Sequence, residues 1–222
     1  TLEILDRYLW RFRDPDLATT AIGSIGRIKF SDRIMVRVKT RAPLPKMLLL
    51  REATYDSYDY GMWSNKRSQF AAIDPDISGT RWKLSERKPD DALAISTYMG
   101  RDTGVIPVPH GVTAIRQIAA TEISRNPMGA VKMEIRQGWV RYVADYDSTL
   151  FANDGPPTAR DLEIAATYRD TFTDLAAQLH LNGPDPAATL QRVRAFFADG
   201  FTYSLTQSHR YPRGRYLAEF LH

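Results

Sequence analysis

The chain has 222 residues, of which 43% are hydrophobic, and its 30 Lys and Arg against 26 Asp and Glu give a formal net charge of +4. This length suits one large domain or two smaller ones without disulfide staples, and the ordinary hydrophobic content excludes a disordered tail. The absence of cysteine excludes a disulfide scaffold, a thiolate metal site and a Cys nucleophile within these residues. No run of roughly 18 apolar residues is present, so no segment is expected to span a membrane. Basic residues are scattered among acidic ones along the whole chain, which argues against nucleic acid as a partner.

The two ends of the sequence resemble parts of longer elements. Leu2, Leu5 and Leu9 recur at helical spacing until Asp14-Pro15 interrupts the pattern, so residues 1–19 are expected to form a short lead-in. Residues 216–222 begin an apolar-periodic element without a stop signal. The pattern indicates a chain truncated within a larger protein.

Residues 20–151 show the alternation that is typical of β-strands. Ile34, Val36 and Val38 alternate with polar or flexible side chains, which predicts a strand with one buried face. Asn126-Pro127-Met128-Gly129 predicts a turn. The runs 130–136 and 139–145 flank Gln137-Gly138 and predict a β-hairpin. Many short strands separated by Gly and Pro favour an antiparallel β-sandwich over 20–151.

Residues 152–222 change to helical periodicity. Thr158, with Asp161 three residues later, predicts a helix that starts at Thr158 and stops by Asn182-Gly183-Pro184. Asp185 as N-cap and Pro186 at the first helical position predict a second helix, which ends at Gly200. A short strand is expected over 201–205. The predicted fold class is therefore α+β and mainly β: an antiparallel sandwich followed by two α-helices and a short strand.

Candidate chemistry is sparse when the residues are read one by one. The chain has no P-loop, no GxSxG, no HExxH and no GxGxxG pattern. No two of the histidines are spaced three or four residues apart, so no helical metal site is predicted; they are His110, His180, His209 and His222. The Asp residues beside prolines suit either a calcium site or simple turns, and turns are the more common outcome; they are Asp14, Asp16, Asp74 and Asp76. No catalytic, cofactor-binding or metal-binding residue is assigned, and no cofactor is expected.

An aromatic cluster allows two interpretations. Tyr55, Tyr58, Tyr60 and Trp63 lie within nine positions of one another. Exposed aromatic rings can form a platform on which sugar rings stack, but packing at the edge of a sandwich is the more common role.

Several stretches, taken in order, resemble one family. Residues 195–205 resemble the helix and strand that open the core of transglutaminase-like proteins, in the cysteine protease-like superfamily, and Glu219-Phe220-Leu221 stands where that family has an element before its catalytic Cys. Residues 20–34 are similar to the start of the extracytoplasmic sandwich in bacterial membrane-anchored members. Residues 50–58, with Trp63, and 105–109 resemble two further motifs of that sandwich.

The resemblance implies a Cys-His-Asp triad that lies beyond His222. His209 and His222 are not the catalytic His of the family, which follows the Cys in chain order. The resemblance therefore implies a non-catalytic part, inert by itself, of a parent that acts on amide bonds as a protease, amidase or transamidase with protein or peptide substrates. It also implies a periplasmic location and anchorage by transmembrane helices outside this chain. The domains would be a lead-in (1–19), a sandwich (20–151) and the helical start of the transglutaminase-like domain (152–222).

Two further possibilities follow from the residues themselves. An Ig-like sandwich can instead be a binding module for a peptide or a glycan. The helical stripes after residue 152 need apolar cover, and a second copy of the chain could supply it for the C-terminal part.

Overall fold

The computed structural model describes residues 19–21, 34–40, 43, 48–59, 62–65, 69–149, 159, 161–202 and 216–221. They fall into two compact units. The sandwich unit holds Thr19 and the described residues of 26–57 and 64–157, and the helical unit holds those of 20–25, 58–63 and 158–222. The fold class is α+β and mainly β, as the sequence predicts.

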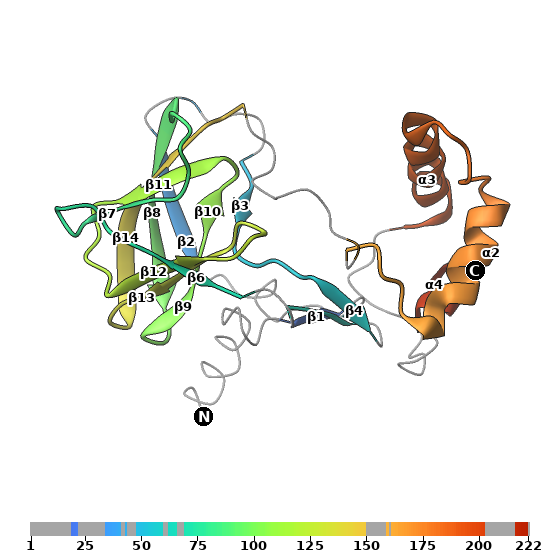
Figure 1. Ribbon diagram of the computed structural model, residues 1–222, viewed down its shortest axis with the longest axis horizontal. Helices are drawn as coiled ribbons and strands as arrows, with labels where there is room; N and C mark the ends of the chain where they lie inside the picture. The colour runs from blue at the N-terminus through green and yellow to red at the C-terminus, as the bar shows by residue number, and fades with distance from the viewer. Residues whose placement is uncertain are drawn as a thin grey trace. The chain divides into compact units, whose positions relative to one another are not determined.

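Two antiparallel sheets face each other in the sandwich unit (Figure 1). The large sheet has the order β2 (Val36–Thr40), β8 (Asp91–Met99), β14 (Gly138–Tyr146), β11 (Val112–Arg116) and β7 (Arg81–Lys83). The small sheet has the order β6 (Ala71–Ile73), β12 (Glu122–Arg125), β13 (Val131–Glu134) and β9 (Thr103–Ile106). Two small sheets complete the described strands. One pairs β10 (Val108–Pro109) with β3 (Leu50–Arg51), and the other has three strands in the order β1 (Thr19–Ala21), β5 (Met62–Ser64) and β4 (Ser57–Asp59).

The core of the sandwich unit lies between the two sheets. Period-two alternation turns Leu93, Ile95 and Met99 of β8 inward, opposite Ile123 and Met133 of the small sheet. All five side chains are at most 3% exposed. Burying a side chain of this size stabilises the folded state by about 1.5–3 kcal/mol relative to leaving it exposed. Strands that alternate apolar and polar residues therefore gain stability by packing their apolar faces together, as the two sheets do here.

The predicted hairpin between 130–136 and 139–145 is wrong. β13 pairs with β12 and β9, whereas β14 pairs with β8 and β11, so the chain passes from the small sheet to the large sheet at Gln137. Asp102, in the connection from β8 to β9, holds this crossing: its backbone oxygen accepts from the Ile135 N–H at 2.8 Å and its side chain from the Gln137 N–H at 2.8 Å. Both strands bury alternate residues, and alternation identifies a buried face without identifying the partner strand.

The predicted turn at Asn126–Gly129 is confirmed. The Gly129 N–H donates to the Asn126 carbonyl at 3.0 Å, and Gly129 has a φ of +81°, which favours glycine. The Asn126 side chain is buried; it accepts from the Ala130 N–H at 2.8 Å and donates to the Thr54 hydroxyl at 2.8 Å. The hairpin of this region is therefore β12–β13, one turn earlier than the sequence predicts.

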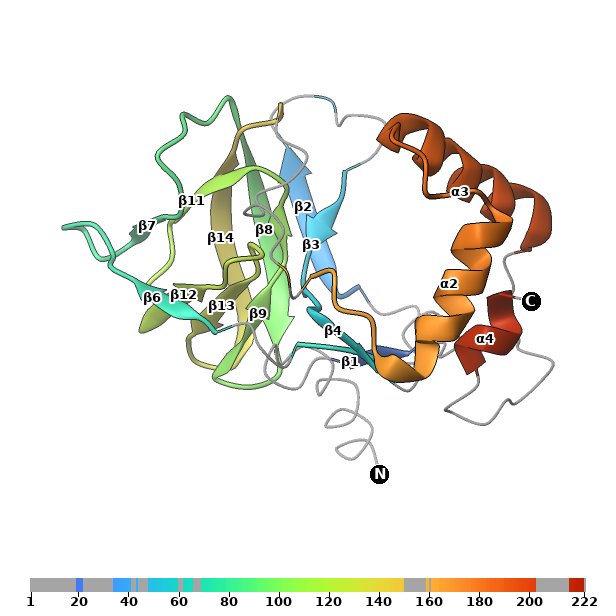
Figure 2. The same ribbon diagram turned by 45° about the vertical axis from the view of Figure 1, so that its right-hand side comes forward.

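The helical unit contains η3 (Ala166–Tyr168), α2 (Arg169–Gln178), α3 (Pro186–Gly200) and α4 (Tyr216–Leu221). Figure 2 shows α2 and α3 as a helical hairpin, with α4 beside α2. Their core is Tyr168, Leu175 and Leu221, with half-buried aromatic rings packed around them. Phe201 contacts Phe220 across ring centroids 4.9 Å apart, so α4 is tied to the end of α3.

The first helix starts later than predicted. Thr158 lies outside the described residues, and Asp161–Ala165 is not helical: the chain becomes helical only at η3. Ala165 is extended (φ −56°, ψ 137°), and Leu162, an apolar residue within the span of the expected helix, is 76% exposed. The helix forms where burial of Tyr168 and Leu175 stabilises it, not where the capping pattern begins.

The second helix is confirmed. The Asp185 side chain accepts from the Ala187 N–H at 2.9 Å, Pro186 occupies the first turn, and the helix ends at Gly200. Phe201 is extended (φ −126°, ψ 135°), and the rest of the strand expected over 201–205, beyond Thr202, lies outside the described residues. Of the predicted lead-in over 1–19, residues 1–18 lie outside them as well, and Thr19 begins β1.

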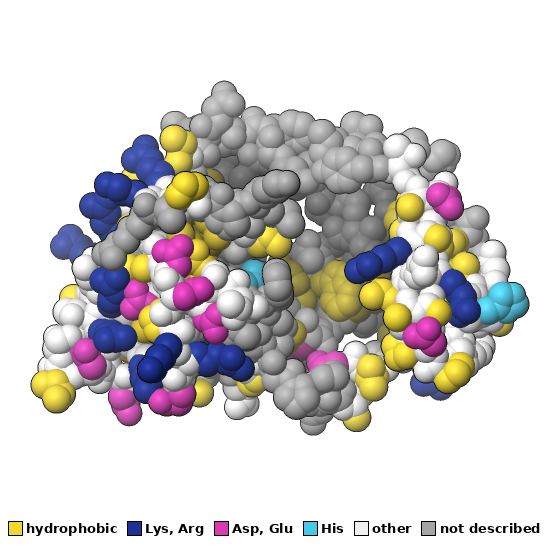
Figure 3. Space-filling view, turned by 90° about the horizontal axis from the view of Figure 1, so that it is seen from above, with side chains coloured by type: hydrophobic (Ala, Val, Ile, Leu, Met, Phe, Trp, Pro, Cys, Tyr) yellow, Lys and Arg dark blue, Asp and Glu magenta, His cyan; other side chains and the backbone are white. Residues whose placement is uncertain are grey.

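Charged side chains are distributed unevenly on the sandwich unit. Figure 3 shows Lys and Arg gathered along one side of it, with Asp and Glu interspersed with basic groups elsewhere on that view. Among the described residues, no helix is long and apolar enough to cross a bilayer.

Candidate functional site

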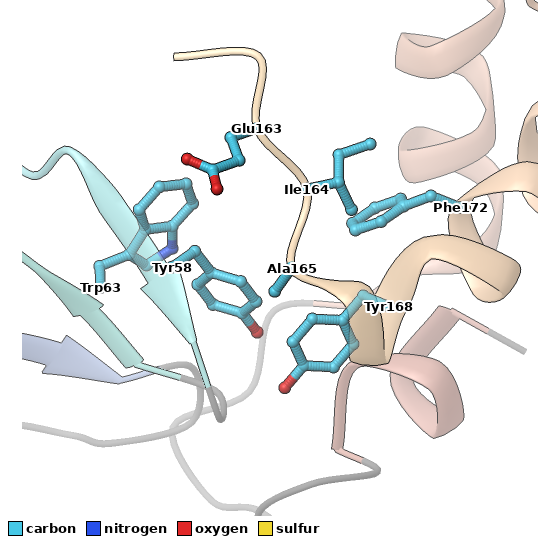
Figure 4. Close-up of a pocket in the computed structure, with 7 residues that line it drawn as sticks. All are labelled: Tyr58, Trp63, Glu163, Ile164, Ala165, Tyr168 and Phe172. Atoms are coloured by element: carbon cyan, nitrogen blue, oxygen red, sulfur yellow. The ribbon is translucent and has the colours of Figure 1, made fainter. Parts of the chain in front are cut away.

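The helical unit contains a pocket of about 240 Å³ (Figure 4). Tyr58 and Trp63 line one side, Ile164 and Phe172 line the other, and Glu163 reaches over the opening toward Trp63. The lining is completed by Ala165 and Tyr168. The pocket is therefore walled mainly by aromatic and aliphatic groups.

Two chain segments far apart in sequence form the pocket. Tyr58 comes from β4 and Trp63 from β5, and their ring centroids lie 4.9 Å apart at 49°. Tyr58 also contacts Tyr168 of η3, at 5.6 Å and 41°. Tilted aromatic pairs at these distances contribute about 0.5–1.5 kcal/mol beyond their area burial, so the three rings form a fixed wall.

The extended segment before α2 supplies the opposite wall. Because Asp161–Ala165 is not helical, Glu163 and Ile164 project differently than they would from a helical turn. Tyr168 is 1% exposed and anchors the segment, whereas Ile164 is 45% exposed and Trp63 is 41% exposed. The floor is fixed and the rim is accessible to solvent.

The lining residues suit binding more than bond cleavage. Among the described lining residues there is a single carboxylate, Glu163, and no Ser, Cys or His that could act with it as a nucleophile–base pair. A volume of about 240 Å³ lies below the roughly 300–1,000 Å³ of pockets for drug-sized ligands. The pocket can accept one aromatic or aliphatic side chain, or one sugar ring.

Of the aromatic cluster singled out from the sequence, the structure brings together Tyr58 and Trp63. They pack with Tyr168 in the helical unit, whereas Tyr55 belongs to the sandwich unit and Tyr60 lies outside the described residues. Burial and the nearby Glu52 raise the pKa of Tyr55. The sequence does not predict that residues of 163–172 line the pocket. A helix starting at Thr158 would place their side chains around a helical turn instead.

The described histidines are not gathered into a site. His110 follows β10 and is half-buried, and its Nδ1 has no hydrogen-bond partner among the described residues. His180 follows α2 with a φ of +52°. His209 and His222 lie outside the described residues. Within the part of the chain that the structure describes, no three His, Asp or Glu side chains are close enough to hold a metal ion.

Two described acidic residues beside turns, Asp76 and Asp90, act as hydrogen-bond acceptors. Asp76 accepts from the Ser78 N–H at 3.0 Å and the Ser78 hydroxyl at 2.5 Å, and these bonds hold the pKa of its carboxyl below the usual value. Asp90 does the same for Ser148, at 2.8 and 2.5 Å, and its pKa is lowered for the same reason. Asp14 and Asp16 lie outside the described residues.

Comparison with known proteins finds similarity in structure only. No family model matches the sequence, and a search of curated proteins finds no match. The periplasmic domain of TgpA from Pseudomonas aeruginosa superposes with a TM-score of 0.66, at 16% sequence identity, over 91% of this chain and 68% of that one. A second structure of this domain, bound to ethylmercury, gives a TM-score of 0.66 and 17% identity over 91% of this chain and 69% of that one.

The fold resembles that of the TgpA periplasmic domain. The similarity extends over nearly the whole chain, so it includes both the sandwich and the helical elements rather than a sandwich alone. At 16–17% identity it describes the fold, and both neighbours are periplasmic domains.

Proposed function

We propose that the chain is the non-catalytic, extracytoplasmic part of a transglutaminase-like protein whose full length acts on amide bonds through a Cys-His-Asp triad. In this proposal residues 1–19 lead into a sandwich domain (20–151), and residues 152–222 begin the transglutaminase-like domain. The observation that carries it is the similarity to the TgpA periplasmic domain over 91% of the chain. The ordered sequence motifs of the transglutaminase-like family support it independently.

The chemistry requires a thiol that these 222 residues lack. In a transglutaminase-like reaction a thiolate attacks the amide carbonyl, a His takes the thiol proton, and an Asp orients the His. The acyl group then passes to an amine or to water. The role left to this chain is to position the catalytic part and to present its substrate.

The test compares the 222-residue chain with the full-length gene product. Each is incubated with casein and a dansylated amine, and both amine incorporation and ammonia release are measured. The full-length protein should be active and should lose activity on alkylation with iodoacetamide, whereas the 222-residue chain should be inactive. Turnover by the chain alone, or full-length activity that survives alkylation, would contradict the proposal.

The location is tested separately with a reporter that folds only outside the cytoplasm. Alkaline phosphatase fused after the sandwich in the full-length gene should be active in a bacterial host, because its disulfides form in the periplasm. A cytoplasmic reporter fused at the same point should be silent. The reverse pattern would refute the extracytoplasmic assignment.

A second candidate function is a binding module for a peptide or a glycan, and the pocket favours it. Trp63 is 41% exposed beside the ring of Tyr58, which provides an accessible aromatic face of the size of one side chain or sugar ring. Titration with short peptides and oligosaccharides should shift the indole NMR signal of Trp63. Trp63→Ala should abolish binding, and Trp139→Ala, far from the pocket in sequence, serves as the matched control.

A further inference from the structure

The outer face of the large sheet gathers cations that are dispersed in the sequence. Inward residues alternate with outward ones, and the register places Arg37, Ser96 and Arg141 in one row across β2, β8 and β14. The next row is Lys39, Ala94, Val143, Arg116 and Arg81. A third row is Ala92, Asp145, Ala114 and Lys83.

The charge on this basic face, defined by these three rows, exceeds the net charge of the chain. It carries six Lys and Arg against one Asp, whereas the whole protein has a formal net charge of +4. Asp145 accepts from the Arg116 Nε at 2.9 and 3.0 Å, so that pair is neutralised. Lys83 pairs with Glu86 at 2.5 Å at the margin of the face, and Asp76 lies near Arg81.

Three cations of this face, two on the edge strand β2 and one on β14, have no carboxylate partner among the described residues. Arg37, Lys39 and Arg141 are all exposed, and no described Asp or Glu forms an ion pair with any of them. Strands lie about 4.8 Å apart and alternate residues about 7 Å apart, so the backbone positions of the three residues lie within roughly 12 Å of one another. Such a cluster of exposed cations creates a positive potential that attracts anions.

The arrangement of the cations on the basic face matches a flat anionic surface better than a linear polyanion such as single-stranded nucleic acid. Small side chains occupy its middle, at Ala92, Ala94 and Ser96, and the long cationic side chains stand on both sides of them. The cations are therefore spread in two dimensions. In the three rows that the structure describes, no aromatic rings lie between the cations on which successive bases could stack, as single-stranded nucleic acid requires.

An exposed tryptophan adjoins the cations. Trp139 is 56% exposed, packs edge-on against Tyr98 at 5.9 Å, and lies under the Arg37 guanidinium at 5.5 Å. Trp and Tyr favour the boundary between lipid headgroups and hydrocarbon. A basic patch beside such a pair is the combination that binds peripheral proteins to anionic membranes.

We propose that the outer face of the large sheet binds an anionic lipid surface, with Arg37, Lys39 and Arg141 contacting headgroup phosphates and Trp139 inserting at the headgroup level. The inference rests on the charge and geometry of the sandwich unit and is independent of the proposed function. It is a contact of the sheet with lipid, distinct from any anchoring helix.

The test is flotation of the full 222-residue chain with lipid vesicles. Vesicles of phosphatidylcholine alone should bind little, and vesicles containing phosphatidylglycerol as about one third of their lipid should bind strongly at low salt. Binding should fall sharply at about 0.5 M salt, where the Debye length is near 4 Å. The Trp fluorescence should shift to the blue on binding, and Trp139→Phe should remove most of that shift.

Charge reversal locates the contact. The triple variant Arg37→Glu, Lys39→Glu, Arg141→Glu should bind anionic vesicles at least roughly a hundredfold more weakly, since each cation near such a surface contributes roughly fivefold and each new Glu adds repulsion. The matched control is Arg136→Glu, Arg169→Glu, Arg194→Glu, which makes the same net change at exposed positions outside the basic face. It should retain most of the binding. Circular dichroism and thermal melting verify folding, and single Arg→Gln variants replace any triple variant that fails to fold.

Three results would overturn the proposal. Equal binding to neutral and anionic vesicles would show that charge does not drive the contact. An equal loss in both triple variants would place the contact elsewhere. Binding to soluble heparin without binding to anionic vesicles would identify a polyanion in solution as the partner instead of a membrane.

Discussion

His180 shows how one residue can carry a conformational cost that the sequence does not reveal. It has a φ of +52°, in the region that favours glycine. The Leu181 N–H donates to the Ala176 carbonyl at 2.9 Å, and the His180 N–H donates to the Ala177 carbonyl at 3.2 Å. These bonds form the Schellman motif that ends α2, with His in the position that glycine usually occupies.

Replacing this residue should therefore stabilise the protein. His180→Gly removes a cost of about 1–2 kcal/mol for a left-handed L-residue, offset in part by the greater freedom of glycine in the unfolded chain. We expect the free energy of unfolding to rise by up to about 1 kcal/mol, measured by urea denaturation. Ala177→Gly, within the same helix, should instead lose about 1 kcal/mol. A loss in His180→Gly as large as that in the control would contradict the strain argument.

At the scale of the elements, β8 and β14 form the centre of the sandwich unit. They pair along their whole length, from Gly138 opposite Met99 to Tyr146 opposite Asp91. Two polar contacts close the end of this pair: the Tyr146 hydroxyl donates to Asp91 at 3.0 Å, and the Ser148 N–H donates to Asp90 at 2.8 Å. Tyr142, near the middle of β14, donates its hydroxyl to the Pro107 carbonyl and so ties the strand to the connection between β9 and β10.

The Tyr146 contact predicts how stability changes at alkaline pH. Burial, and then the hydrogen bond to Asp91 with its negative charge, raise the pKa of Tyr146 from 10.0 to about 12. The unfolded chain releases this proton at lower pH than the folded one, so the contribution is fully present below pH 10 and is lost as pH rises through 12. As the pH is raised from 10 to 12, the urea concentration at the midpoint of unfolding should fall in the wild-type protein. It should fall less in Tyr146→Phe.

A matched substitution separates this effect from general alkaline unfolding. Tyr98→Phe, on the outward face of β8, leaves the Tyr146–Asp91 pair intact and should keep the wild-type slope. Identical slopes in wild type and Tyr146→Phe would show that the hydroxyl does not carry the dependence.

For the whole molecule, the two units differ in how much apolar surface they bury. The sandwich unit encloses a large core between its sheets, whereas α3 of the helical unit has no buried residue among its described positions. Leu190 is 51% exposed and Phe197 is 44% exposed. Exposed apolar faces of this kind often mark sites of protein–protein contact. We propose that, in the isolated 222-residue chain, a second copy packs against this face of α3.

Self-association should therefore depend on α3. The double variant Leu190→Gln, Phe197→Gln keeps good helix formers at exposed positions, so we expect a loss of only about 1 kcal/mol in unfolding free energy. The concentration-dependent dimer expected of the wild-type chain in sedimentation experiments should disappear. Arg194→Gln on the same helix should leave association unchanged. A wild-type chain that stays monomeric at all concentrations would rule out the second copy.

Part of the candidate site can be predicted from the sequence. Tyr58 and Trp63 are recognisable as an aromatic pair that needs packing, and Asp185 with Pro186 defines the start of α3. The residues on the other side of the pocket were missed. Glu163 and Ile164 reach it only because the chain before α2 is extended, and burial of Tyr168 favours that conformation over the local helical pattern.

The sequence by itself determined the classes of element and which side of each strand is buried, because period-two and helical spacing are local properties of the chain. It also determined what chemistry is absent, since a chain without cysteine has no thiolate. Only the tertiary structure decided the partner of each strand, which sent β13 and β14 to different sheets. The same register brought Arg141 onto one face with Arg37 and Lys39, which precede it by more than a hundred residues. Strand pairing is a long-range choice made by burial and register together, so dispersed charges in the sequence became a concentrated surface in the fold.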